Sequence, residues 1–182
     1  LFIPSPFAVT IPDNAVTIID EQGANDEPGQ KDLTQMSFVA NELVAWSWDE
    51  TDVWSGANTG DACTLFDTDD DGNANYSLCV QLGTSDTGEA DFLGTILYSC
   101  GDNQPDRCTQ AVNEVESWLA DDASNPCSVD IVNTDPFASV GDDSPNDTQA
   151  ACDLNPVLPL LTIGSSQPDL LNVCSYPSGR PN

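Results

Sequence analysis

The sequence contains no histidine and almost no basic residues. Its 182 residues include 3 Lys and Arg against 31 Asp and Glu, which gives a formal net charge of -28 at pH 7. Such a chain has almost no side chains to contact nucleic-acid phosphates, and an anionic membrane repels it at long range. The absence of histidine also excludes Ser-His and Cys-His nucleophiles. Nucleic acid and membranes are therefore not expected partners.

Catalytic motifs are scarce as well. The single lysine, Lys31, lies in a polar stretch, and neither G-x-S-x-G nor H-E-x-x-H occurs. The remaining catalytic chemistry is a pair of carboxylates acting on a glycoside, with tryptophans stacked on the sugar rings. Close carboxylate pairs are unavoidable among 31 acidic residues. We therefore expect no enzyme, and a secreted glycoside hydrolase ranks last among the functions considered.

No apolar run is long enough to cross a bilayer. The first residue is leucine, and the opening stretch lacks a basic segment and is interrupted by prolines. It is therefore not a signal peptide, and we expect one to have been removed upstream. This predicts an extracellular or cell-surface location.

Seven cysteines are present without a C-x-x-C pair, so disulfides in an oxidising compartment are expected rather than a zinc or redox site. Short loop closure favours three pairs: Cys100 with Cys108, Cys63 with Cys79, and Cys127 with Cys152. Cys174 then remains, either for an intermolecular bond or as a buried thiol. The loop 100–108 is most simply a disulfide-closed turn in which Asp102 or Asp106 pairs with Arg107.

Short apolar runs with alternating character indicate strands. Met36, Phe38 and Ala40 recur at every second position, and Val44, Trp46 and Trp48 follow at the same period. Turn residues separate further runs at 76–82, 92–100, 127–132, 157–163 and 169–175. One helix is predicted within 109–122, where four apolar residues share a face. The predicted fold is all-β, an antiparallel β-sandwich (Ig-like or jelly-roll-like) with long acidic loops and at most one short helix.

The first 32 residues differ from the rest of the chain. Two apolar runs within residues 1–19 precede a polar, glycine-rich stretch at 20–32. We therefore predict an N-terminal strand-forming extension with its loop over 1–32 and a calcium-binding β-sandwich domain over 33–182. The extension either adds to an open sheet edge of a neighbouring copy, as in donor-strand exchange, or forms the first strands of its own domain.

The stretch FDTDDDGNANYSLCV, residues 66–80, concentrates carboxylates at one turn. Asp67, Asp69 and Asp71 occupy positions 1, 3 and 5 of D-x-D-x-D-G, and Gly72 stands where the chain must turn sharply. Positions 7 and 9 offer Asn73 and Asn75 as further oxygen donors. The loop resembles those of EF-hands, dockerins and thrombospondin type 3 repeats. Oxygen-only donors favour calcium, which would relieve the mutual repulsion; a solvated acidic turn is the alternative.

Position 12 of this loop holds Leu78 in place of the bidentate glutamate, so the missing ligands must come from elsewhere. Asp49 and Asp52 belong to the nearest acidic stretch and are the candidates. A second acidic region between Cys127 and Cys152 offers Asp142 and Asp143 for another cation; a proline-punctuated surface loop is the alternative there.

Longer stretches resemble pieces of large secreted bacterial surface proteins. They are SGANTGDACTLFDTDDDGNANYSLCV, YSCGDNQPDRC, NTDPFASVGDDSPNDTQAAC and LLNVCSYPS. Together they cover most of residues 45–178 and are similar to β-sandwich modules of adhesin-like, cell-wall-anchored proteins. The resemblance implies an extracellular β domain rigidified by calcium. It carries the calcium role onto Asp67, Asp69, Asp71 and Asn73.

Three functions follow from these features. The first is a self-assembling structural subunit of a surface fibre, filament, sheath or layer, whose partners are copies of itself joined through the N-terminal segment. The second is a calcium-dependent adhesive or carbohydrate-binding module, which exposed tryptophans would favour and buried tryptophans would disfavour. The hydrolase is third.

Overall fold

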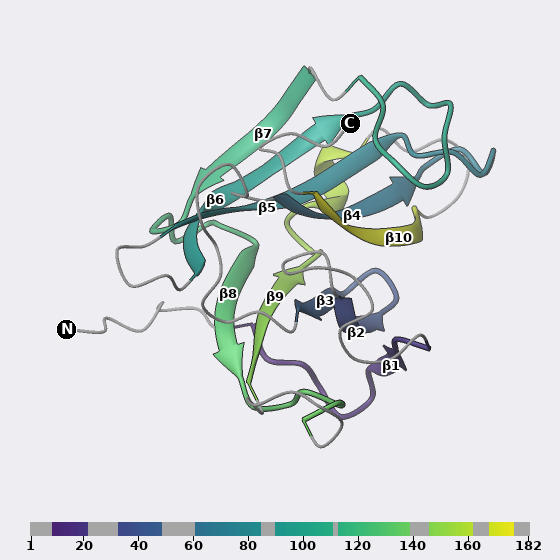
Figure 1. Ribbon diagram of the computed structural model, residues 1–182. Coiled ribbons are helices and arrows are strands. Elements are labelled where there is room, and N and C mark those ends of the chain that lie inside the picture. Colours follow the sequence, from purple (N-terminus) through teal and green to yellow (C-terminus); the bar gives the residue numbers. More distant parts are fainter. Residues whose placement is uncertain are drawn as a thin grey trace.

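Two five-stranded antiparallel sheets pack face to face in the computed structural model of the chain (Figure 1). The structure describes residues 9–21, 33–48, 61–84, 90–110, 113–138, 146–161 and 168–176. The predicted all-β antiparallel sandwich is confirmed. In the described residues we find no helix with the length and apolar character needed to cross a membrane.

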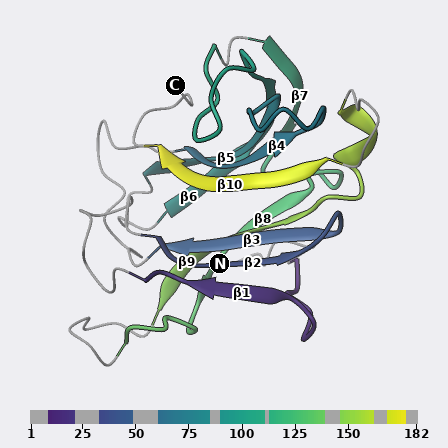
Figure 2. The same cartoon turned by 90° about the vertical axis from the view of Figure 1, so that its right-hand side faces the viewer.

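The first sheet has the strand order β1-β2-β3-β9-β8, and the second has the order β10-β4-β5-β6-β7. The strands of the first sheet are β1 (Val16–Ile19), β2 (Leu33–Val39), β3 (Leu43–Trp48), β8 (Cys127–Val132) and β9 (Asp147–Asp153). Those of the second are β4 (Asp61–Asp67), β5 (Tyr76–Thr84), β6 (Ala90–Ser99), β7 (Asn113–Leu119) and β10 (Asp169–Tyr176). The outer strands β1 and β10 lie on the same side of the sandwich, with β7 and β8 on the other (Figures 1 and 2).

The core between the sheets follows the period-two pattern of the sequence. On β3, Val44, Trp46 and Trp48 face the other sheet and are fully buried. The two indole rings meet edge to face with centroids 6.3 Å apart. Leu78 and Val80 of β5 face them from the opposite sheet and are also fully buried. Alternating side chains therefore build one apolar layer, as expected for a sandwich.

Each sheet also has a small apolar cluster on its outer face. On the second sheet, Leu65, Cys79 and Tyr98 pack beneath the segment that ends at Cys108. On the first sheet, Val9 and Ile11 pack against Leu43, Ala45 and Ala151. Chain segments that are not strands thus shield both outer faces from water in part.

The N-terminal residues 9–21 lie against their own sheet. The Val9 N–H donates to Ser128 Oγ at 3.2 Å, and β1 pairs with β2 so that Val16 stands opposite Phe38. This is the second of the two arrangements that the sequence left open for this segment. Residues 1–8 lie outside the described part, and donor-strand exchange between copies stays a prediction.

Three disulfides join neighbouring segments, and they are the three predicted pairs: Cys63–Cys79, Cys100–Cys108 and Cys127–Cys152. The first links β4 to β5 and the third links β8 to β9, in each case between residues directly opposite in the ladder. Cys174 stands opposite Cys63 on β10; its side chain is not among those described.

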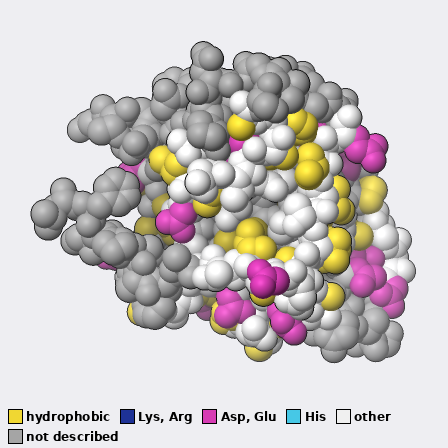
Figure 3. All heavy atoms as spheres, turned by 90° about the horizontal axis from the view of Figure 1, so that it is seen from below, with side chains coloured by type: hydrophobic (Ala, Val, Ile, Leu, Met, Phe, Trp, Pro, Cys, Tyr) yellow, Lys and Arg dark blue, Asp and Glu magenta, His cyan; other side chains and the backbone are white. Residues whose placement is uncertain are grey.

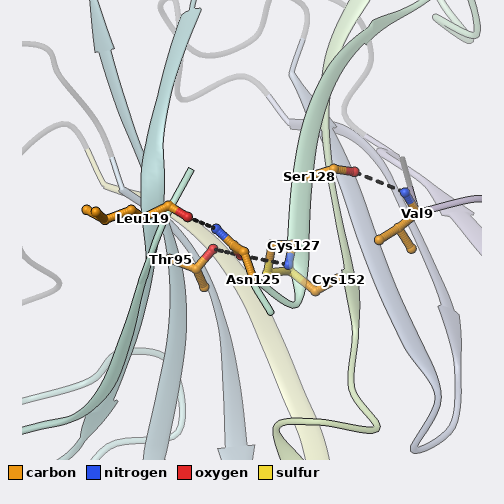
Figure 4. Close-up of a disulfide and its surroundings, with 7 residues drawn as sticks. All are labelled: Val9, Thr95, Leu119, Asn125, Cys127, Ser128 and Cys152. Atoms are coloured by element: carbon orange, nitrogen blue, oxygen red, sulfur yellow. Dashed lines mark hydrogen bonds between the residues drawn. A yellow bond between two sulfur atoms is a disulfide. The ribbon is translucent and has the colours of Figure 1, made fainter. Parts of the chain in front are cut away.

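The crossover from the second sheet to the first is held by Asn125 (Figure 4). Its Oδ1 accepts hydrogen bonds from Thr95 Oγ1 at 2.8 Å and from the Cys127 N–H at 2.9 Å. Its Nδ2 donates to the Leu119 carbonyl at 3.0 Å. One amide side chain therefore ties β6, β7 and β8 together beside the Cys127–Cys152 disulfide.

Two sequence predictions of local structure were wrong. The predicted helix within 109–122 is instead β7, which pairs with β6 so that Trp118 stands opposite Thr95 and packs on the core. Val115 and Leu119, assigned to the buried face of the helix, are 40% and 71% exposed. Pairing with β6 overrides the helical spacing. The predicted strand at 157–163 begins as a turn and a 3-10 helix (η3, Leu158–Leu160), because Pro159 cannot donate to a ladder.

Carboxylates dominate the charged surface. On the face seen in Figure 3, Asp and Glu side chains are spread among apolar and neutral ones, and no Lys or Arg appears among the coloured atoms of the described residues. Arg107 forms a salt bridge with Asp106 at 2.7 Å, which confirms one of the two pairings predicted for the 100–108 loop. Both of these side chains are about half exposed.

Candidate metal centre

The acidic stretch forms the loop between β4 and β5. Phe66 and Tyr76 are the last paired residues of this hairpin, and Asp67, the last residue of β4, leads into the loop. Asp70 and Gly72 adopt the left-handed backbone conformation, with φ of 65° and 84°. A Cβ at Gly72 would meet nothing within 4 Å, so glycine is favoured here by its backbone conformation rather than by lack of space.

Asp67 organises the loop. Its side chain is almost fully buried, at 3% exposure. Its Oδ1 accepts hydrogen bonds from the N–H groups of Asp69 at 3.0 Å and Asp70 at 2.9 Å, and its Oδ2 accepts one from Gly72 at 2.7 Å. Burial alone would raise the pKa of Asp67, but these three donors outweigh it and hold the pKa below its usual value. The first carboxylate of the motif is therefore kept ionised.

Three carboxylates converge on one point. One oxygen each of Asp67, Asp69 and Asp71 lies within 4.8 Å of the others. Asp69 and Asp71 are exposed, whereas Asp67 forms the buried floor. The cluster can hold a metal ion, and its oxygen-only donors suit a hard cation. The predicted spacing of positions 1, 3 and 5 thus produces the convergence for which it was singled out.

The two asparagines of the loop make hydrogen bonds within it. Asn73 donates through its N–H to Asp71 Oδ1 at 2.7 Å and through Nδ2 to Asp71 Oδ2 at 2.9 Å. Asn75 Oδ1 accepts from the N–H and the hydroxyl of Thr68. These bonds position Asp71 and close the loop. The roles of Asn73 and Asn75 as metal ligands stay predictions.

A fourth carboxylate near the cluster was missed in the sequence. Asp102 is exposed and has a positive φ of 51°. Partial desolvation, and then the negative charges of Asp71, Asp69 and Asp67, raise the pKa of Asp102. It therefore experiences the field of the cluster, although 30 residues lie between it and Asp71, the nearest of these carboxylates along the chain.

Backbone hydrogen bonds bring the two loops together. The Ala74 N–H donates to the Gln104 carbonyl at 2.8 Å, and the Cys100 N–H donates to the Asn75 carbonyl at 2.8 Å. The Cys100–Cys108 disulfide closes the second loop. The sequence predicted that the 100–108 loop is closed by a disulfide, but the spacing of its residues did not indicate that it contacts the acidic turn.

The structure does not test the other carboxylates predicted as metal ligands. Asp49 and Asp52, and likewise Asp142 and Asp143, lie outside the part that the structure describes. In the second acidic region, Asp147 is fully buried and accepts a hydrogen bond from Thr34 Oγ1 at 2.7 Å. A second cation there stays a prediction.

The position of Leu78 explains one departure from the EF-hand pattern. It stands at position 12 of the motif, where an EF-hand has a glutamate, but it is fully buried between the sheets. A charged residue at this place would lie in the core. The loop therefore continues into a strand, and the ligand that glutamate supplies in an EF-hand would have to come from another segment.

Comparisons of the chain with protein-family models, with curated proteins and with solved structures found no match.

Proposed function

We propose that the protein is an extracellular structural subunit that assembles with copies of itself through its N-terminal segment, stiffened by three disulfides and by calcium. The observation that carries the proposal is the open side of the sandwich, where β1 is an outer strand. Val16, Ile18 and Ile19 of β1 are 54%, 53% and 48% exposed, and the strand has no charged residue. Exposed apolar residues on an uncharged outer strand mark this side of the sandwich as a surface that another chain can cover.

The outer strands on the other side of the sandwich, β7 and β8, are protected against pairing with another chain. Glu114 and Glu116 of β7 and Asp130 of β8 are exposed carboxylates on strands that end their sheets. Charged side chains on an edge oppose pairing with another chain, and copies with a charge of -28 repel each other. Assembly is therefore directed to the side of β1 and β10.

Calcium is the cation that best suits the Asp67, Asp69 and Asp71 cluster. Its flexible coordination by oxygen ligands tolerates a loop that lacks the glutamate of an EF-hand. The neighbouring loop with Asp102 is hydrogen-bonded to the same turn. A bound ion would stiffen the end of the β4–β5 hairpin and neutralise part of the repulsion between copies.

Burial of the tryptophans favours assembly over glycan binding. Trp46 and Trp48 are fully buried, and Trp118 is partly buried against the core. The described tryptophans therefore offer no flat exposed platform for sugar rings; Trp54 lies outside the described residues. Extracellular location agrees with the disulfides, which persist in oxidising compartments.

Electron microscopy of the native, unreduced protein tests this function. With calcium, the expected result is regular filaments or sheets, and after chelation they should loosen or shorten. Dispersed monomers under both conditions would overturn the structural role and turn attention to adhesion, for which a glycan-binding assay is the next measurement.

A further inference from the structure

Among the described residues, no strand lies opposite the inner face of β1. Val16 and Ile18 stand opposite Phe38 and Met36 of β2, so these four side chains share one face of the sheet. Met36 packs against the core between the sheets, which makes this the inner face. Val16 and Ile18 nevertheless remain more than half exposed, because the part of the facing sheet that the structure describes ends at β10. A further strand beside β10 would cover them.

A cavity lies at the same open side. Its volume is about 220 Å³, and it lies between the β2–β3 turn and the start of β10. Phe38, Phe66 and Leu170 are among its lining residues. Phe38 also stands opposite Val16, so one wall of the cavity adjoins the exposed inner face of β1. We call the cavity and this adjoining face the apolar groove; it lies at the start of β10, which is the outer strand of its sheet among the described residues.

We propose that residues 1–8 of a second copy occupy this groove as an added strand beside β10. The added strand would cover Val16 and Ile18 and place an apolar side chain in the cavity. This inference rests on the proposed function and deepens it, because it names the donor segment, the acceptor surface and the symmetry of the contact between copies.

The sequence of residues 1–8, LFIPSPFA, suits such a donor. The segment has no charged residue and the same number of residues as β10, which has eight. Pro4 and Pro6 are two apart, so in a strand their missing N–H groups lie along one edge. Ile3, Ser5 and Phe7 retain their N–H groups on the other edge. The segment can therefore pair on one side only, and it blocks addition of yet another strand.

The point at which residues 1–8 leave the body favours exchange between copies. Val9 is hydrogen-bonded to Ser128 of β8, which is the outer strand opposite β1 in the five-stranded sheet. Four strand spacings of about 4.8 Å put β1 about 19 Å away. Eight extended residues reach about 26 Å. Most of the segment would therefore be needed to reach the groove of its own copy, and few residues would remain to pair there.

Donor and acceptor on opposite sides define the symmetry of the assembly. Each copy would donate from the β8 side and accept on the side of β1 and β10. Such a contact is heterologous, and it produces open filaments unless the rotation between copies closes a ring. A two-fold dimer is not expected.

A matched pair of variants of the full chain tests the groove. Ile18→Asp places a charge on the uncovered face, and Ile131→Asp places the same charge on β8; the two side chains are 53% and 47% exposed. Sedimentation velocity and electron microscopy with calcium should show that Ile18→Asp raises the concentration needed for assembly roughly tenfold or more. Ile131→Asp should assemble as the wild type does, and both variants should melt like the wild type.

A competition experiment does not depend on the folding of a variant. A synthetic peptide of residues 1–8 is added to the full chain, and it should occupy grooves and shorten the filaments. The same peptide with Ser5→Pro lacks one N–H on the pairing edge and should be much weaker. Filaments that are insensitive to Ile18→Asp and to the peptide would overturn the groove but leave the structural function in place. A wild type that never assembles would overturn both.

Discussion

Removal of the cation is expected to lower the stability of the fold, and the magnitude follows from the acidic loop. Full charges 4.8 Å apart repel by about 1 kcal/mol per pair in water, so the three pairs among Asp67, Asp69 and Asp71 contribute about 3 kcal/mol that a cation would relieve. Calcium at a hundred times its dissociation constant stabilises by a similar amount, about 2.7 kcal/mol. For a chain of this size the melting temperature should rise by about 5–10 °C.

The assay is thermal unfolding with calcium, with magnesium and with a chelator, all at one ionic strength. Constant ionic strength is needed because salt alone screens a net charge of -28. Asp69→Ala should remove the calcium-dependent shift, while Asp121→Ala, an exposed aspartate in the turn after β7, should keep it. Wild-type protein that melts at one temperature in all three solutions would refute the site. A full calcium shift in Asp69→Ala would place the ion elsewhere.

Three substitutions test contacts that do not depend on calcium. Asp67→Asn should lower the free energy of unfolding in chelator by about 1–3 kcal/mol, because one of three backbone donors loses its acceptor. If urea denaturation instead gives a higher free energy of unfolding, charge repulsion outweighs these bonds. Asn125→Ala should lower it by about 2–3 kcal/mol, since the buried Thr95 hydroxyl loses its partner, and an unchanged urea midpoint would contradict its bridging role. Gly94→Ala should lower it by about 1–3 kcal/mol, because a Cβ would lie 2.3 Å from the Trp118 oxygen at a φ of 153°; an unaltered melting curve would show that β7 shifts freely.

The strands that the sequence predicted well are those with apolar alternation. The run at 127–132 coincides with β8, and those at 76–82 and 169–175 fall within β5 and β10. The strands β4 and β9 were not predicted, although Leu65, Phe66 and Ala150 on them are fully buried. Each of these two strands begins and ends with aspartate and contains only a short apolar run, so its local sequence resembles a loop. Burial of these strands between neighbours becomes evident only when the sheets are formed.

The candidate metal centre, like the strands, was predicted from the sequence only in part. The spacing of Asp67, Asp69 and Asp71 predicted their convergence, because all three belong to one short turn closed by a glycine. Asp102 could not be found by spacing, since it reaches the cluster only through the hydrogen bonds that join two loops of the same sheet. The helix expected at 109–122 was wrong for the same reason, because β6 offers a partner strand that no local pattern reveals.

Composition and local spacing by themselves determined the sandwich class, the three disulfide pairs and the acidic loop, because each depends on residues close together in the chain or on period-two alternation. Tertiary structure alone decided which strands lie at the edges, that Trp46 and Trp48 are buried, and that Asp102 joins the acidic turn. It also left Val16 and Ile18 exposed on the inner face of β1. These features depend on strand order and on packing between distant segments, which are set by the free energy of the whole fold rather than by any one stretch of sequence.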